Sequence, residues 1–138
     1  MKGTERRRRA QFPCFETTEA IIGCFYRVYN ALGYGFLERV YVRALAREMR
    51  DLGLAVDLEV PLPVFYADEC VGAYRADCVV EASVIVEVKA VRTLAPEHGA
   101  QLLHYLRSTD IEVGLLLNFG NGPTFKRLAY SNNRKADR

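Results

Sequence analysis

The sequence has no long hydrophobic run, and this absence sets the first limits on its class. Its longest apolar stretches fall far short of the roughly 20 residues that a membrane-spanning helix needs, so we predict no membrane segment. The arginines at positions 6 to 9 are followed by no apolar segment, which excludes a secretory signal. Internal repeats and low-complexity linkers are also missing. With 138 residues, 50% of them hydrophobic and 26% charged, the chain fits one globular domain.

The sequence also lacks cysteine pairs at the spacing of a zinc site. None of its cysteines belongs to a C-x-x-C pair, and nothing else in the chain indicates a secreted disulfide scaffold. We therefore predict free thiols in a reducing cytoplasm, most of them as small core residues. The cysteines are Cys14, Cys24, Cys70 and Cys78.

A strong net charge is the third missing feature. The formal charge is +2, too small for an overall attraction to nucleic acid. Charge gathers instead at the ends, in Arg6 to Arg9 and in the basic-leaning residues 132–138. We predict residues 1–16 and 132–138 as disordered tails around a single domain over residues 17–131. The basic start either adds attraction for phosphate or is a solvated end without a role, and the sequence leaves both open.

Helical periodicity occurs three times along the chain. A first helix is expected to begin at Thr17 or Thr18, with the threonine as its N-cap, and a Gly-Tyr-Gly triplet ends it with a turn. A second helix is expected over residues 36–52, with Gly53 at the capping position after it. A third is expected over residues 96–108, with a proline in its first turn.

Between these helices, a period of two predicts strands. The strand expected over residues 54–60 is stopped by two prolines, which favours a place at the edge of a sheet. The other strands are expected at residues 64–66, 71–80, 84–91, 111–119 and 124–130, with turns at residues 67–70 and 118–123. The resulting order, ααβββ(β)αββ, predicts a mixed sheet with helices against it, in the α/β or α+β class.

The second predicted helix carries a stripe of arginines. Arg39, Arg43, Arg47 and Arg50 follow at spacings of four, four and three residues, so they share one helix face. Such a stripe is typical of a solvated face. Its sharper interpretation is a ridge that contacts phosphates.

The run at residues 84–91 places charges inside an otherwise apolar strand. Side chains alternate between the two faces of a strand, so Glu87 and Lys89 point the same way while the valines beside them point into a core. Burying charges costs free energy unless they are paired or bind a metal. This pair therefore needs a structural or a chemical explanation.

The preceding predicted strand supplies a second acid. If residues 81–83 form the loop between the two strands, Asp77 lies directly opposite Glu87. Two carboxylates at that separation repel each other unless a cation lies between them, and Mg²⁺ suits such a place. A two-residue loop would instead put the two acids on opposite faces of the sheet.

Lys89 adds a positive charge to this acidic pair. Its ammonium group would orient or deprotonate an attacking water, or stabilise the charge that grows on a phosphate during hydrolysis. A bound metal ion would lower the pKa of that water and polarise the phosphate. The plainer alternative is a buried Asp–Lys–Glu salt-bridge set that only fixes the strand register, and the spacing alone leaves both open.

Several segments, taken in order, resemble one known family. Asp77, followed after nine residues by Glu87-Val88-Lys89, resembles the D…E-x-K core of the PD-(D/E)XK nuclease superfamily. Residues 35–41 resemble the motif of its small bacterial GxxExxY branch. Further segments that resemble this branch are residues 74–77, 85–91 and 98–106, within a likeness that covers about residues 18–130.

This resemblance implies a restriction-endonuclease-like core, a central mixed sheet flanked by helices. It implies that Glu38, Asp77 and Glu87 are the acidic residues of a metal site and that Lys89 is the catalytic lysine. From the residues alone, Glu38 would need no such role, because a carboxylate in the first turn of a helix is favoured by the helix dipole.

The resemblance adds two supporting positions. Gln101 falls where many relatives carry a glutamine that helps the site, and the backbone carbonyl of Val88 joins the implied metal ligands. Ala76 stands where the motif name has proline, a common departure. Tyr41 is expected in the core rather than as a platform for a base.

The predicted function is that of a metal-dependent nuclease that hydrolyses phosphodiester bonds in DNA, or with less support in RNA, using Mg²⁺ or Mn²⁺. Two alternatives stay open: a catalytically silent module that binds nucleic acid or protein, and a small assembly subunit whose acids form only a salt-bridge network. A homodimer is a further option. The predicted contacts to nucleic acid are Arg39, Arg43, Arg47, Arg75 and His98.

Overall fold

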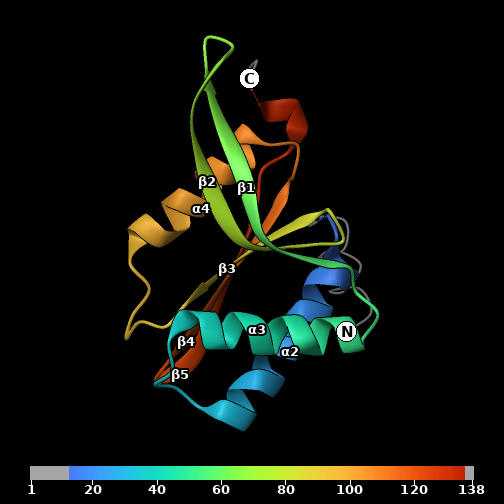
Figure 1. Ribbon diagram of the computed structural model, residues 1–138, viewed down its shortest axis with the longest axis vertical. Helices are drawn as coiled ribbons and strands as arrows, with labels where there is room; N and C mark the ends of the chain where they lie inside the picture. Colours follow the sequence, from blue (N-terminus) through green and yellow to red (C-terminus); the bar gives the residue numbers. More distant parts are fainter. Residues whose placement is uncertain (1–12, 136–138) are drawn as a thin grey trace, which may run out of the picture.

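The computed structural model describes residues 13–135, which form a mixed sheet with helices on both faces (Figure 1). The elements are α2 (Phe15–Leu32), α3 (Glu38–Asp51), β1 (Val56–Tyr66), β2 (Glu69–Val80), β3 (Val84–Lys89), α4 (Pro96–Ser108), β4 (Val113–Gly120), β5 (Gly122–Ala129) and a 3-10 turn (Asn132–Arg134). None of the helices in this range is both long enough and apolar enough to cross a membrane. The predicted basic run at positions 6 to 9 lies outside the described residues.

The five strands form one sheet in the order β1-β2-β3-β4-β5. Helix α4 connects β3 to β4, and these two strands run parallel, while every other neighbouring pair is antiparallel. A parallel pair needs such a crossover, whereas antiparallel neighbours can be joined by short turns. The predicted fold class, a mixed sheet flanked by helices, is confirmed.

The sheet separates two apolar cores. Helices α2 and α3 pack against one face, over Val84, Val86 and Val88 of β3. Helix α4 packs against the opposite face, over Ile85 and the neighbouring strands. Figure 1 shows α2 and α3 close together and α4 on the other side of the sheet, with the β1–β2 hairpin extending away from α2 and α3 and running alongside α4. The alternation predicted for β3 is therefore confirmed, because its valines face α2 and α3.

Two helix starts differ from the prediction. Helix α2 begins at Phe15, and Thr18 lies inside its first turn, where its buried hydroxyl donates to the backbone carbonyl of Phe15 at 2.9 Å. The threonine is therefore not the N-cap. Phe15 is itself buried, so packing extends the helix beyond what local propensity indicates. Helix α3 begins at Glu38 rather than at residue 36.

The end of α3 agrees with the prediction. Gly53 has a φ of 86°, a conformation that favours glycine, and its N–H donates to the carbonyl of Arg50. The N–H of Leu54 reaches back to the carbonyl of Met49. These two hydrogen bonds form a Schellman motif, so Gly53 occupies the glycine position that follows the C-cap.

The prediction that two prolines end the first strand is wrong. β1 runs through Pro61 and Pro63, which lie opposite Arg75 and Ala73 of β2. The strands expected separately at residues 54–60 and 64–66 therefore form one strand, and the strand given in brackets in the predicted order is not a separate element. β1 is the edge strand, as predicted. An edge strand tolerates proline at alternate residues because the N–H groups on its outer side have no partner to lose. The turn after β1 has two residues, both with positive φ, which suits a tight hairpin.

The C-terminal part is more regular than predicted. β4 continues to Gly120 and β5 begins at Gly122. The turn expected over residues 118–123 is therefore a single residue. The expected tail is docked as far as Lys135, whose ammonium group donates to the carbonyls of Thr109 and Ile111 at 2.8 and 2.9 Å. Hydrogen bonding to the α4–β4 connection therefore orders residues that composition alone assigns to a tail.

Candidate functional site

The β2–β3 connection decides which side chains meet. Its loop has three residues, because Val80 pairs with Val84 and Cys78 pairs with Val86. Two residues of this loop, Glu81 and Ala82, adopt positive φ values of 53° and 52°, which closes the turn tightly. Continuing this register by one residue places Asp77 opposite Glu87. The condition on loop length is therefore met, and the two acids lie on the same face.

The regular pairing of β2 and β3 stops at this point. Asp77 turns its carboxylate toward β3, and Oδ2 accepts a hydrogen bond of 2.8 Å from the backbone N–H of Val88. A side chain thus supplies the acceptor for a strand N–H. The bond fixes the position of the Asp77 carboxylate beside Glu87.

Glu87 is held in an unfavourable environment for a charge. Its Oε1 is buried and has no hydrogen-bond partner among residues 13–135. Burial, followed by the negative charge of Asp77, raises the pKa of Glu87 to about 8, while the positive charge of Lys89 acts in the opposite direction. A cation bound between the two carboxylates would remove both penalties.

Lys89 lies one side-chain step beyond Glu87 on β3 and is half-buried. Within the described residues it makes no salt bridge with either Asp77 or Glu87. A salt-bridge set that only fixes strand register would need such direct pairs. The geometry therefore speaks against that alternative and leaves the ammonium group available to a substrate.

Glu38 approaches the acidic pair from α3. It is the first residue of that helix, is exposed, and lines a cavity of about 450 Å³ together with Asp77, Arg39 and Arg43. Glu87 does not line this cavity. Among residues 13–135, no three acidic, histidine or cysteine side chains lie close enough together to hold one ion. The structure thus brings Glu38 to the cavity of Asp77 but not into a cluster with the acidic pair.

The segment around Glu38 is shaped by its neighbours in the motif. Gly35 has a φ of 115°, which side-chain-bearing residues rarely adopt. The hydroxyl of Tyr41 donates to the carbonyl of Gly33 at 2.7 Å and accepts from the N–H of Phe36 at 3.1 Å. Tyr41 is fully buried, as predicted. The glycine and the tyrosine therefore fix the turn from which Glu38 starts the helix.

Helix α4 lies on the face of the sheet opposite α2 and α3 and carries three side chains of interest. Gln101 is exposed, and no hydrogen bond of its side chain is present in the described range. Tyr105, one turn later, is buried against Tyr74 with 4.7 Å between the ring centroids. Burial and then the charge of Glu87 raise the pKa of Tyr105 to about 12. His98 caps the helix, because its Nδ1 accepts from the N–H of Ala95 at 3.0 Å.

Tyr105 and Glu59 belong to this region although the sequence did not predict them. Tyr105 follows Gln101 by four residues on one helix face, and this spacing was the available signal. Glu59 lines the same cavity as Asp77, and its φ of 51° interrupts the pairing of β1 with β2. No sequence pattern indicates such a φ at a glutamate.

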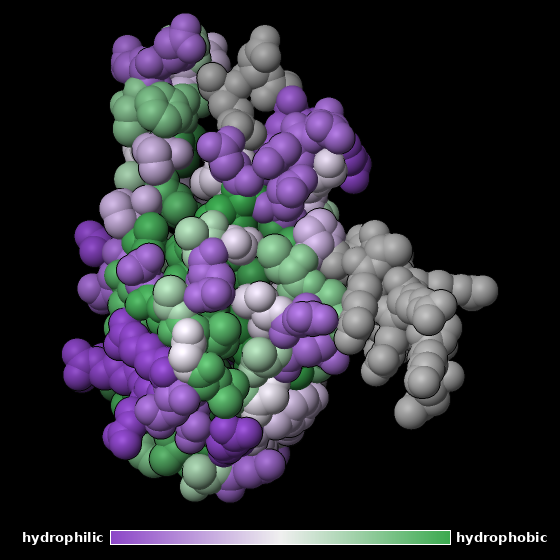
Figure 2. All heavy atoms as spheres, turned by 90° about the vertical axis from the view of Figure 1, so that its right-hand side faces the viewer, coloured by the Kyte–Doolittle hydropathy of each residue, from purple (hydrophilic) through white to green (hydrophobic). Residues whose placement is uncertain are grey.

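The predicted arginines fall into two groups. Arg39 and Arg43 are exposed on the cavity wall and form no ion pair among residues 13–135. Arg47 pairs with an acid one turn along α3, and Arg50 donates to a backbone carbonyl at 2.8 Å. Arg75 is exposed on β2, two residues before Asp77. In Figure 2 hydrophilic side chains gather at the lower left, the side on which α3 lies.

Of three comparisons with known proteins, one places the chain in a family. A family model described as "PD-(D/E)XK nuclease superfamily" matches residues 15–128. No curated protein matches the chain. A solved structure described as "Crystal structure of SSO0001" is similar with a TM-score of 0.42 and 17% identity. The similarity covers 78% of this chain and 64% of that structure's chain, so this chain spans about two thirds of the other's length. Because the family model matches most of this chain, the chain belongs to the PD-(D/E)XK nuclease superfamily.

Proposed function

We propose that this member of the PD-(D/E)XK nuclease superfamily is a metal-dependent nuclease that hydrolyses phosphodiester bonds in DNA, with RNA as the less favoured substrate. The observation that carries the proposal is the buried Oε1 of Glu87, which has no hydrogen-bond partner in the described part of the chain and lies opposite the anchored carboxylate of Asp77. Two carboxylates held in this way destabilise the fold unless a bound cation neutralises them, and such costly groups are concentrated at functional sites. Membership of the GxxExxY branch is part of the proposal, supported by Gly35, Glu38 and Tyr41.

The donor set fits Mg²⁺ or Mn²⁺. Asp77, Glu87 and the backbone carbonyl of Val88 would hold the ion, with Glu38 as a further acid nearby. A hard cation of this kind needs only one or two carboxylates, because waters and phosphate oxygens complete its shell. When bound, the ion lowers the pKa of a coordinated water and polarises the phosphate.

The remaining side chains act on the substrate and the water. The ammonium group of Lys89 orients the attacking water and stabilises the negative charge that develops on the phosphate. Gln101 supports the site from α4. Arg39 and Arg43 attract the phosphate backbone toward the cavity that contains Asp77, because neither guanidinium forms an ion pair among residues 13–135. Arg47, Arg75 and His98 are the outer predicted contacts.

Cleavage assays with matched variants test this function. Purified protein should cut DNA with Mg²⁺ or Mn²⁺ and should lose activity with a chelator. Asp77→Asn keeps an acceptor for the strand N–H, and Lys89→Ala removes only the ammonium group, so both should fold and both should lose roughly 100-fold or more in rate. Lys126→Ala on the exposed side of β5 serves as the control. Full cleavage by both site variants would contradict the assignment.

A second candidate function is a catalytically silent module that binds nucleic acid. The observation in its favour is that Arg39 and Arg43 are unpaired while no cluster of three metal-binding side chains is present among residues 13–135. This function predicts salt-sensitive binding that neither chelator nor Asp77→Asn changes. Loss of binding in either condition would exclude it. Homodimer formation and the cytoplasmic location stay predictions, and all four cysteines are free thiols.

A further inference from the structure

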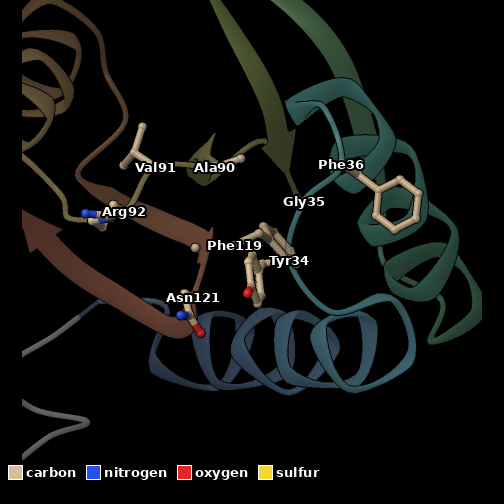
Figure 3. A pocket seen from close by; sticks show the side chains of 9 residues that line it. Tyr34, Gly35, Phe36, Ala90, Val91, Arg92, Phe119 and Asn121 are labelled. Carbon is tan, nitrogen blue, oxygen red and sulfur yellow. The ribbon is translucent and has the colours of Figure 1, made fainter.

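A second cavity opens one residue beyond Lys89. It has a volume of about 330 Å³ and lies where three segments converge: the α2–α3 turn, the chain that follows β3, and the β4–β5 turn (Figure 3). We call it the base pocket. Its lining residues are Tyr34, Gly35, Phe36, Ala90, Val91, Arg92, Phe119, Gly120 and Asn121.

Each wall of the base pocket is fixed by a side chain that bonds to its backbone. Tyr41 holds the α2–α3 turn through its hydroxyl. Buried Asn118 holds Val91 twice, with Oδ1 accepting at 3.0 Å and Nδ2 donating at 2.9 Å. The hydroxyl of Tyr29 donates to the carbonyl of Gly120 at 3.0 Å and accepts from the N–H of Gly122 at 2.7 Å. A cavity whose walls are all fixed loses little entropy when a ligand enters.

The pocket carries one aromatic ring without a partner. Tyr34 is 59% exposed, and within residues 13–135 it has no hydrogen bond and no ring contact. Phe36 is also exposed, but its ring packs edge-on against Tyr41, and Figure 3 shows it turned away from the other lining side chains. Phe119 is buried beneath the pocket. Tyr34 is therefore the ring that can stack on a ligand.

Polar groups at the rim fit the rest of a nucleotide. Arg92 is exposed and forms no ion pair in the described part of the chain, so its guanidinium is available to a phosphate. The side chain of Asn121 has donors and an acceptor, which match the edge of a base. An aromatic ring, a cation and an amide around a small cavity are the groups that bind an unpaired base and its phosphate.

We propose that the base pocket binds one unpaired nucleobase of the nucleic acid, adjacent to the phosphate at Lys89. Tyr34 stacks on the base, Asn121 contacts its edge, and Arg92 contacts the flanking phosphate. The proposal rests on the proposed function and narrows its substrate class. A base inside a duplex cannot enter such a pocket without unstacking, so the preferred substrate is a single strand or a junction with an unpaired nucleotide at the cut.

Binding measured without metal tests the pocket separately from cleavage. Fluorescence anisotropy in a chelator would compare a labelled single strand with the same strand built from abasic nucleotides. Tyr34→Ala should weaken binding of the normal strand by about 5- to 150-fold, the loss of one stacked base. Tyr34→Phe keeps the ring and should bind like wild type. Tyr66→Ala, at the exposed tip of the β1–β2 hairpin, is the matched control and should change nothing.

The outcomes separate this inference from the nuclease proposal. If Tyr34→Ala weakens binding of the abasic strand as much as binding of the normal strand, the ring does not stack on a base and the inference is wrong. It is also overturned if wild type binds only duplex, or if a nucleoside monophosphate binds as tightly as the strand, which would assign the pocket to a free nucleotide. If binding depends on Tyr34 while no metal supports cleavage, the base pocket stands and the nuclease proposal fails.

Discussion

Replacing Glu87 by glutamine tests the electrostatics of the acidic pair. In the folded protein, burial and the charge of Asp77 raise the pKa of Glu87 from 4.5 to about 8. The folded chain therefore keeps a proton that the unfolded chain releases near its ordinary pKa. The contribution of the protonated Glu87 to the free energy of unfolding is fully present below pH 4.5 and is lost as the pH rises to about 8. Glutamine has the same shape and no charge to bury, so it removes this dependence.

The size of the effect follows from the shift. Between the two pKa values the unfolded chain has lost the proton that the folded chain keeps, so each pH unit lowers the free energy of unfolding by about 1.4 kcal/mol. Between about pH 6 and pH 8, wild type should lose about 2 kcal/mol relative to Glu87→Gln. A divalent ion should reverse this loss for wild type at the higher pH and leave the variant unchanged, because its binding needs the charged carboxylate.

Urea denaturation followed by circular dichroism measures the difference. Both proteins would be unfolded at about pH 6, 7 and 8, first in chelator and then with Mg²⁺. Glu69→Gln is the control, because this carboxylate is exposed at the start of β2 and its removal should leave the pH dependence of wild type intact. A constant difference between wild type and Glu87→Gln over this range would show that folding does not raise the pKa of Glu87, and a metal site at this pair would lose its main support.

Three further predictions concern the frame of the site. Gly120→Ala would make a methyl group collide with the backbone oxygen of Val91 and should lower the free energy of unfolding by about 2 kcal/mol or more. Gly99→Ala, with open space around it, should leave the free energy of unfolding unchanged or raise it by up to about 1 kcal/mol in the same urea experiment. Tyr41→Phe removes both hydrogen bonds to the turn before α3 and should cost about 1–3 kcal/mol, with no loss taken as evidence that the turn holds itself. A thiol-reactive disulfide reagent should modify exposed Cys70 in the native protein but Cys78 only after unfolding, because burial raises the pKa of that thiol to about 12. Rapid native modification of the second thiol would contradict its burial.

Local patterns were sufficient for much of the fold. Period-two alternation placed Glu87 and Lys89 on one face of β3, and the third helix was predicted with its observed limits. The glycine after α3 was predicted from its position alone. These features depend on neighbours in the chain, so a single sequence contains enough information to predict them.

Other features depended on contacts between distant segments. The prolines of β1 looked like strand ends, and only the edge position makes them compatible with a longer strand. The start of α2 depends on a core that buries Phe15. The last residues looked like a tail, yet Lys135 finds carbonyl acceptors on the α4–β4 connection. Composition does not report a partner that is far away in sequence.

The sequence by itself identified Glu87 and Lys89 as candidate site residues, because two charges at alternate positions of an apolar strand are costly to bury, and it offered Asp77 on the preceding strand as their partner. It did not determine whether the two acids face each other, because that depends on loop parity. Only the tertiary structure decided this, through the pairing of Val80 with Val84 and the bond from Val88 to Asp77. The base pocket belongs wholly to that level: Tyr34, Arg92 and Asn121 lie far apart in the chain, and packing alone brings them together.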